Sequence, residues 1–347
     1  MVLRSDINFL IGNYCDQRIQ AANELSPTYQ RLWQTIQIYL QAGGKRFRPY
    51  FMILTYQAYG GKDRETMLHV ATAWELLHSS LLIHDDIIDR DYIRHGVPNI
   101  AGIYQDIYKQ SLDEKEAHHY AASAALLAGD LILNSVFDFI MLSQLTSDDK
   151  VKVTSMLNEA MFVVGGGEFL DVEASILPYG AVDSALIAQQ KTAHYSFLSP
   201  MLSGAMMANT PPAQLNILRE FAVAVGLGYQ LVDDLLGLYG EENTIGKSIT
   251  SDLREAKLTV VFDEIMKLGN FEQRATLQAI TGSKYISNGD VSTIRKLGID
   301  TGAKQAVEHE IIKQTNIALE LLETLSITNE FKSEFRWIIA ATLERNA

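Results

Sequence analysis

The sequence contains two pairs of adjacent aspartates, Asp85–Asp86 and Asp233–Asp234, and an apolar run precedes each pair. Asp89 follows the first pair at helical spacing; a helix would place Asp85 and Asp89 about 40° apart and Asp86 about 100° from Asp85. Unpaired carboxylates are costly to bury beside Leu and Ile, and three together repel one another. A hard cation such as Mg²⁺ relieves both problems, because it takes carboxylate oxygens and completes its shell with water and phosphate. A solvated acidic helix end could explain one such cluster, but its repetition favours metal-bound phosphate.

Basic residues that could bind a phosphate group are concentrated in Gly43–Pro49, between two predicted helices. Lys45, Arg46 and Arg48 stand there beside two glycines, just before the proline that opens the next helix. A helix N-terminus, its backbone N–H groups and fixed cations all attract a diphosphate. A solvated basic turn is the alternative, and it is disfavoured in so acidic a chain.

Other polar side chains lie where a helix would align them with the aspartates. His78 precedes Asp85 by seven residues, two helical turns back on the same face, although a single histidine there is more often a core residue. Lys191–Thr192 lies inside a predicted helix, where such a pair is usually exposed to solvent. Basic residues also follow each aspartate pair: Arg90, Arg94 and His95 after the first, and Lys247, Arg254 and Lys257 after the second.

The composition favours a globular chain that attracts anions only locally. Its 347 residues carry a net charge of -13, with 47% hydrophobic and 20% charged residues. This charge disfavours nucleic acids and anionic membrane surfaces, both of which need a basic surface. An anionic substrate must therefore be held by a basic pocket or by bound metal cations.

The cellular compartment is predicted from signals that the sequence lacks. Cys15 is the only cysteine, so neither an internal disulfide nor a thiolate metal cluster can form within one chain. The N-terminus has no secretory pattern, and no apolar run looks long enough to span a bilayer. We expect a cytoplasmic protein without a transmembrane segment.

Helix start and stop signals recur along the chain and predict an all-α fold. Ser26-Pro27 is a start signal and Gly43-Gly44 a stop signal. The mostly apolar residues 67–88 predict a largely buried helix. The further predicted helices span residues 49–60, 63–91, 116–144, 147–171, 182–209, 212–239, 253–268, 302–324 and 328–345. With only 7 prolines and no linker-like stretch, we expect one domain over residues 1–347.

Taken together, these segments resemble the trans-type (head-to-tail) polyprenyl diphosphate synthase family, and are similar to its geranylgeranyl diphosphate synthases. The resemblance runs from Gly44 to about Thr259 in the family's own order. The matching segments are Gly44-Lys45-Arg46-Phe47-Arg48-Pro49, the helix from Glu75 through His78 to Asp89, Arg94-His95-Gly96, Gly129-Asp130, Gly167-Glu168-Phe169-Leu170-Asp171, Lys191-Thr192, Tyr229-Gln230 with Asp233-Asp234, Gly246-Lys247, Asp252 and Lys257.

The resemblance implies an isoprenoid-synthase helical bundle around a deep central cavity, usually in a homodimer. It also implies Mg²⁺ as the cofactor, with three ions in each active site. The first aspartate cluster would hold two ions on the allylic diphosphate, and the second cluster a third ion. The metal ligands that it implies are Asp85, Asp86, Asp89, Asp233 and Asp234, with Asp171 as a further candidate.

The same resemblance implies two substrates, an allylic prenyl diphosphate and isopentenyl diphosphate. Residues that would act on the allylic diphosphate or its metals, besides the aspartates, are Arg94, Lys191, Thr192, Gln230, Lys247 and Lys257. Residues that would bind isopentenyl diphosphate are Gly44, Lys45, Arg48, His78 and His95. The implied reaction is 1'-4 condensation by metal-assisted ionisation, attack of the C=C bond on the allylic cation and loss of a proton.

Three residues depart from the family pattern. His95 replaces an arginine that normally contacts isopentenyl diphosphate, and a histidine offers neither a permanent charge nor a bidentate fork. Glu168 replaces a glutamine and adds an anion near Asp171. Gly237 replaces a third aspartate, a variant that many family members share.

Product length in this family depends on the side chains upstream of the first aspartate. A large aromatic residue five positions before it stops growth early, but this chain has Ser80 there, with Leu81 beside it. Leu77 and Trp74 lie one and two turns further along roughly the same face, and Trp74 could form the cavity floor or be ordinary core packing. We expect C20 geranylgeranyl diphosphate, then C25–C35 products, and C15 farnesyl diphosphate with less weight.

Two other functional classes agree less well with the sequence. A terpene cyclase or head-to-head synthase of the same fold would not need the pocket of Lys45 and Arg48, because it does not use isopentenyl diphosphate. A non-catalytic subunit of a heteromeric synthase would tend to lose its aspartate motifs, and both are present here.

Overall fold

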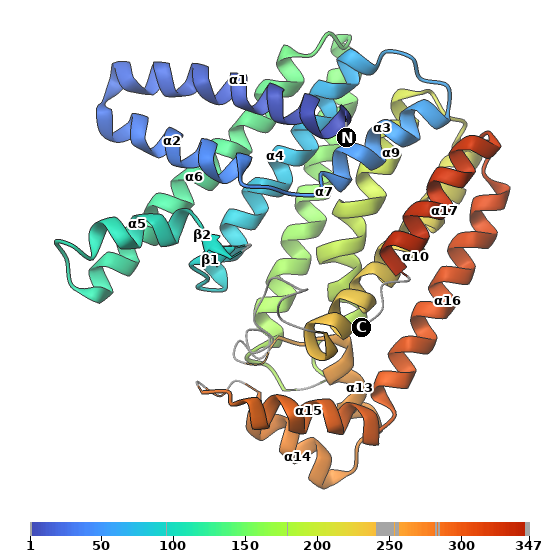
Figure 1. Cartoon of the computed structure of the whole chain (residues 1–347). Helices are drawn as coiled ribbons and strands as arrows, with labels where there is room; N and C mark the ends of the chain where they lie inside the picture. Colours follow the sequence, from blue (N-terminus) through green and yellow to red (C-terminus); the bar gives the residue numbers. More distant parts are fainter. Residues whose placement is uncertain are drawn as a thin grey trace. The chain divides into compact units, whose positions relative to one another are not determined.

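The computed structural model describes residues 2–94, 96–178, 180–240, 253, 257–281, 283 and 285–343, most of which are helical (Figure 1). Within this described part, the β-structure is one short antiparallel hairpin, β1 (Ile93–Arg94) with β2 (Val97–Pro98). The expected all-α fold is confirmed. The chain forms two compact units, Met1–Ile53 with Gly61–Ser155, and Leu54–Gly60 with Met156–Ala347. That they act as one domain remains a prediction.

The first unit consists of a helical hairpin and a long buried helix with its covering helices. Its elements are α1 (Val2–Leu25), α2 (Pro27–Gln41), the first part of α3 (Phe47–Ala58), α4 (Arg64–Ile88), β1, β2, α5 (Ile100–Tyr108), α6 (Glu114–Leu142) and the start of α7 (Ser147–Ala174). Helix α1 packs against α2, and α6 packs against both α4 and α5.

Side-chain caps define where these helices begin. The Ser26 hydroxyl accepts a hydrogen bond from the Tyr29 N–H, and Pro27 occupies the first helical position, as the sequence predicts. Asp63 caps α4 by accepting from the Thr66 N–H at 3.0 Å. These caps satisfy backbone donors that have no partner within the helix.

Small residues allow α4 and α6 to approach closely beside the first aspartate pair. Helix α6 buries a row of alanines and then Gly129. A Cβ atom on Gly129 would overlap the ring of His84, the residue before Asp85. The Gly129 carbonyl also accepts a hydrogen bond of 3.0 Å from Ser80 Oγ. Helix α6 therefore fixes the last turns of α4, which carry Asp85 and Asp86.

The second unit is built around α10, which contacts the segment η1 and helices α16 and α17. Its elements are the end of α3, the rest of α7, α8 (Ser184–Ile187), the π-helix η1 (Ala188–Leu198), α9 (Ser199–Met207), α10 (Pro212–Tyr239), α13 (Val260–Leu268), α14 (Phe271–Ile280), α15 (Asn288–Asp300), α16 (Ala303–Thr324) and α17 (Asn329–Leu343).

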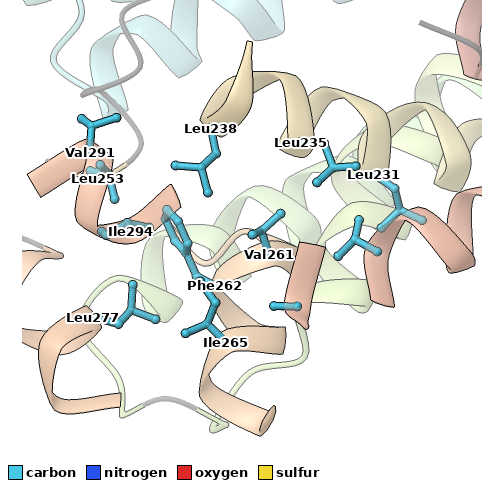
Figure 2. Packing of buried hydrophobic residues seen from close by; sticks show 12 residues of the cluster. Leu231, Leu235, Leu238, Leu253, Val261, Phe262, Ile265, Leu277, Val291 and Ile294 are labelled. Atoms are coloured by element: carbon cyan, nitrogen blue, oxygen red, sulfur yellow. The ribbon is translucent and has the colours of Figure 1, made fainter. Parts of the chain in front are cut away.

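An apolar core anchors the end of α10 that carries the second aspartate pair. Leu231, Leu235 and Leu238 recur at helical spacing and point towards Val261 and Phe262 of α13 (Figure 2). Helices α14, α15 and α16 complete this core. Asp233 lies about 200° from Leu231 around the helix axis and is exposed on the opposite face. The leucine spacing thus sets which way this carboxylate faces.

The predicted helix over residues 182–209 is interrupted by a π-helix. Segment η1 carries Lys191 and Thr192 and joins α8 to α9. Two glycines allow it to lie against its neighbours: a Cβ on Gly226 would come 2.7 Å from Ala193, and one on Gly167 would come 2.5 Å from the Lys191 nitrogen. π-Helical turns of this kind are frequent at functional sites. Composition does not distinguish such a segment from an α-helix.

Other differences from the predicted helices concern polar segments. The predicted helix over 253–268 is wrong at residues 257–259, because α13 begins at Val260 after its cap Thr259. Helices α1, α5, α14 and α15 were not anticipated. Asn270 and Ser287 form capping boxes that start α14 and α15, a signal that the sequence did offer.

Two helices, α6 and α10, are long and apolar enough to cross a bilayer by length and composition. The expectation that no apolar run reaches this length is therefore wrong for these two helices. In their most apolar 18-residue windows, 44% of α6 and 56% of α10 is buried against other parts of the protein. The core helix of a soluble protein meets the same criterion, so this finding is weak evidence for a membrane span.

A Gly226→Ala substitution should destabilise the second unit. The added Cβ would lie 2.7 Å from Ala193 and push η1 away from α10. Overpacking of this kind costs about 1–3 kcal/mol. Gly165→Ala in α7 is the matched control, since nothing lies within 4 Å of its Cβ position and alanine favours a helix by roughly 1 kcal/mol. Thermal unfolding should show a lower midpoint for Gly226→Ala alone; equal midpoints would contradict the close packing of η1.

Candidate active site

The first aspartate cluster is held by an arginine from the β-hairpin. Arg94 Nε donates to Asp86 Oδ1 at 2.8 Å, and Arg94 Nη2 donates to Asp85 Oδ2 at 3.0 Å. All three side chains are largely buried, with Asp86 only 3% exposed. Asp89 caps the C-terminus of α4, where its backbone N–H donates to Asp85 O. The structure therefore brings Arg94, Asp85 and Asp86 together, as the sequence suggested.

Burial and charge act in opposite directions on these groups. Burial raises the pKa of Asp86 to about 6, and the hydrogen bond and charge of Arg94 only partly oppose that rise. Burial acts to lower the pKa of Arg94, but its contacts with Asp86 outweigh that effect and raise it. Arg94 is thus a permanent cation that offsets part of the negative charge of the Asp85 and Asp86 carboxylates.

The carboxylates of the first aspartate cluster are suitable ligands for a hard cation, although in the described structure they are not arranged as a metal site. Across the part of the chain that the structure describes, no group of three or more His, Cys, Asp or Glu side chains is arranged to hold a metal ion. Asp85 and Asp86 contact Arg94 instead, and Asp86 Oδ2 is buried with no hydrogen-bond partner. A buried carboxylate oxygen of this kind suits Mg²⁺, which prefers oxygen ligands.

The basic turn before α3 divides its cations between two tasks. Arg46 points inward and is 5% exposed; its Nη1 donates to Glu75 Oε1 at 2.6 Å. Arg46 Nη2 also donates to the Leu40 carbonyl, and its guanidinium bonds to Asn8. Arg46 therefore holds the turn and is not free for a phosphate cradle. The sequence signal for this pair was Glu75, a single acid inside the apolar stretch of α4.

The remaining residues of this turn stay accessible. Gly43 and Gly44 have φ values of +146° and +120°, which side-chain-bearing residues rarely adopt. Lys45 is exposed, with Nζ 5.6 Å from the centre of the Phe47 ring, and Arg48 is half-buried on the first turn of α3. His78 is half-buried on α4. The expected isopentenyl diphosphate residues Gly44, Lys45, Arg48 and His78 thus remain candidates.

The residues expected to set product length lie on the buried side of α4. Trp74 and Leu77 are fully buried, and Ser80 is 1% exposed with its hydroxyl on the Gly129 carbonyl. Leu81 is half-buried. Within this unit Ser80 thus faces α6.

In the second unit, Lys191 of η1 binds two carboxylates of α7. Lys191 Nζ lies 2.7 Å from Asp171 Oδ2 and 2.9 Å from Glu168 Oε2. The carboxylates of Glu168 and Asp171 therefore contact the same ammonium group, that of Lys191. The close approach of α7 and η1 at Gly167 makes this geometry possible.

The second aspartate pair is oriented by a chain of hydrogen bonds. Thr192 Oγ1 donates to Gln230 Oε1 at 2.6 Å, and Gln230 Nε2 donates to Asp234 Oδ1 at 2.7 Å. The Val260 N–H at the start of α13 donates to Asp234 Oδ2 at 2.9 Å. A helix N-terminus favours a negative charge, so α13 stabilises the ionised carboxylate.

The structure describes only some of the remaining predicted site residues. Asp233 is exposed, and Lys257 is half-buried in the segment before α13. Lys247 and His95, together with Gly246 and Asp252, lie outside the described residues. Their predicted roles stand as predictions.

Comparison with known proteins indicates one family. Residues 29–297 match the family model described as polyprenyl synthetase. A geranylgeranyl diphosphate synthase from Sulfolobus acidocaldarius is 26% identical over 303 residues, covering 83% of this chain and 86% of that protein. A short chain isoprenyl diphosphate synthase from Methanocaldococcus jannaschii is 30% identical and covers 79% of each chain.

A solved structure is similar over nearly the whole length. The geranylgeranyl pyrophosphate synthase from Corynebacterium glutamicum, complexed with isoprenyl diphosphate and magnesium, is 25% identical. It covers 98% of this chain and 99% of its own, with a TM-score of 0.89.

An Arg46→Met substitution should strongly destabilise the first unit. It would leave the Glu75 carboxylate buried without its cation, which costs about 3–5 kcal/mol. Arg64→Met is the matched control, because Arg64 pairs with Asp6 at 2.7 Å but both side chains are about one-third exposed. That loss should stay within about 1 kcal/mol. Chemical denaturation checks both, and similar losses for the two variants would contradict a structural role for Arg46.

Proposed function

The chain belongs to the polyprenyl synthetase family and is a polyprenyl diphosphate synthase, and from this premise we propose that it makes C20 geranylgeranyl diphosphate with Mg²⁺. The observation that carries the proposal is the pairing of predicted metal ligands with predicted diphosphate-binding cations. Arg94 contacts Asp85 and Asp86 in the first unit, and Lys191 contacts Asp171 in the second.

The proposed metal ligands are the carboxylates of the two aspartate clusters. Asp85, Asp86 and Asp89 would hold two ions and Asp233 and Asp234 a third, as the resemblance implies. The similar Corynebacterium glutamicum enzyme was solved with magnesium, which supports the choice of ion. When bound, Mg²⁺ supplies Lewis-acid stabilisation of the charge that develops on the leaving diphosphate.

The chain's own cations would bind the allylic diphosphate by changing partners. Arg94 offers a planar fork that bonds as well to phosphate oxygens as to the carboxylates it contacts here. Lys191 can likewise turn from Asp171 and Glu168 to a phosphate oxygen. Thr192, Gln230, Lys247 and Lys257 complete the proposed diphosphate-binding set.

Isopentenyl diphosphate would bind at the turn before α3. Lys45 is exposed there, Gly44 leaves its backbone accessible, and the Arg46–Glu75 pair holds the turn in place. Arg48, His78 and His95 are the further proposed ligands. Lys45 and Arg48 thereby distinguish this site from that of a cyclase, which uses no second diphosphate.

The proposed product length rests on Ser80 and Trp74. Ser80 is small enough to let the chain grow past it, whereas Trp74 is large and fully buried two turns further up α4. The similar geranylgeranyl diphosphate synthases support C20. C15 and C25–C35 products are the alternatives.

We propose a soluble, cytoplasmic homodimer that folds as one domain. Exposed apolar residues on α6, including Leu126 at 49% and Leu127 at 57%, offer surface for a subunit interface. Large exposed apolar patches commonly mark such interfaces. A non-catalytic role in a heteromeric synthase is the remaining alternative.

The purified protein should extend farnesyl diphosphate by one unit. With Mg²⁺ and labelled isopentenyl diphosphate, chromatography of the products should show mainly C20. An Asp85→Asn, Asp86→Asn double variant serves as the inactive control, because amides are poorer ligands for Mg²⁺ than carboxylates. No extension of farnesyl diphosphate would refute the C20 product. Activity that appears only after a second chain is added would favour the subunit alternative.

A Trp74→Ala substitution should lengthen the product to C25 or beyond if Trp74 closes the cavity. Trp33→Ala is the matched control, because Trp33 is also buried in the first unit but lies on α2. Both variants should lose about 3–5 kcal/mol of stability. Product sizing should show a shift for Trp74→Ala alone; an unchanged C20 product would assign Trp74 to core packing.

A further inference from the structure

Among the described residues, the buried polar atoms without a hydrogen-bond partner include two of opposite kinds that belong to the surroundings of the first aspartate cluster. One is Asp86 Oδ2, and the other is the hydroxyl of Tyr39, near the C-terminal end of α2. A buried polar group without a partner loses the solvation it had in water and gains nothing in return. Such groups persist in a fold when another role requires them.

The Tyr39 hydroxyl lies in the same charged environment as Asp86. Burial raises the pKa of Tyr39, and the negative charge of Asp86 raises it further. The positive charge of Arg94 acts in the opposite direction. Tyr39 is therefore a protonated hydrogen-bond donor, coupled electrostatically to both Asp86 and Arg94.

Tyr14 is a buried tyrosine of the same unit whose hydroxyl does have hydrogen-bond partners. Its hydroxyl lies 2.9 Å from Ser135 Oγ and 2.6 Å from Asp138 Oδ2, either of which can accept its one proton, and it accepts from Arg18 Nε at 2.9 Å. Tyr39 has no such network. Within the described part of the chain, the Tyr39 hydroxyl is therefore available to a ligand.

The two unpaired atoms need opposite kinds of partner. Asp86 Oδ2 is an acceptor and is completed by a cation, whereas the Tyr39 hydroxyl is a donor and is completed by an acceptor. A metal-bound diphosphate brings both at once, the cation for the carboxylate and phosphate oxygens for the hydroxyl.

We propose that Tyr39 is a diphosphate-binding residue whose hydroxyl donates to an oxygen of the metal-bound diphosphate at Asp86. This inference rests on the proposed function, because it requires a diphosphate at the first aspartate cluster. It adds to the site a residue that carries no charge and that no motif in the sequence marks.

The test compares Tyr39→Phe with Tyr14→Phe, each of which removes one hydroxyl. Calorimetry measures the affinity for inorganic diphosphate in Mg²⁺, and thermal unfolding in a chelator measures the stability of the metal-free protein. Tyr39→Phe should bind diphosphate about tenfold or more weakly, since a hydrogen bond to a charged group is lost. Its metal-free unfolding midpoint should be unchanged or higher, because an unsatisfied buried hydroxyl is removed.

Tyr14→Phe should give the opposite pair of results. Its unfolding midpoint should fall, because the hydroxyl loses the proton acceptor that it donates to and the donor Arg18, while diphosphate affinity should match the unsubstituted protein. In steady-state assays, Tyr39→Phe should raise KM for the allylic diphosphate and leave KM for isopentenyl diphosphate unchanged.

Three outcomes would overturn the proposal. Unchanged diphosphate affinity in Tyr39→Phe would mean that the hydroxyl is completed by water alone. A lowered metal-free midpoint together with weaker binding would assign Tyr39 a structural role. Failure of the unsubstituted protein to bind diphosphate or to extend an allylic substrate would refute the proposed function itself, a result distinct from the other two.

Discussion

Buried carboxylates are the constraint on which this structure depends. Asp86, Glu75 and Asp171 lie in largely buried positions, and each contacts a cation from another element, Arg94, Arg46 or Lys191. Without those cations the carboxylates would be protonated or the elements would separate. The hairpin, the basic turn and the π-helix are held where they are partly because they deliver these cations.

The helices meet this constraint by close packing at glycines. Gly129 lets α6 approach the turns of α4 that carry Asp85 and Asp86, while Gly167 and Gly226 do the same for η1. The apolar core beneath Asp233 then fixes the rotation of α10 (Figure 2). Each unit thus positions its own aspartate pair by packing within that unit.

The sequence was sufficient for the helical fold and for the types of residue at the site. The Ser26-Pro27 cap and the apolar runs before the two aspartate pairs indicated helices that are present. The sequence was not sufficient to show in which direction a given side chain points. In the sequence, Lys45, Arg46 and Arg48 are three cations with no visible difference in role. Only the structure shows that the Arg46 side chain points inward and bonds to Glu75. A π-helix differs from an α-helix by one residue per hydrogen-bonded turn, a difference that apolar periodicity does not resolve over eleven residues.

The same cations can balance charge in two states of the protein. In the structure, Arg94 contacts Asp85 and Asp86, which the proposed function assigns to metal ions, and Lys191 contacts Asp171, which the sequence suggests as a further candidate ligand. With metal ions bound to the proposed ligands, Arg94 and Lys191 would be able to bind the phosphate oxygens of a diphosphate, as the proposed function requires. In the proposed complex, a metal ion would contact Asp86 Oδ2 and a phosphate oxygen would accept from the Tyr39 hydroxyl, so both atoms would gain a partner that the described residues do not offer. A chain with net charge -13 would therefore bind a polyanion in part with the cations Arg94 and Lys191, which otherwise contact its own carboxylates.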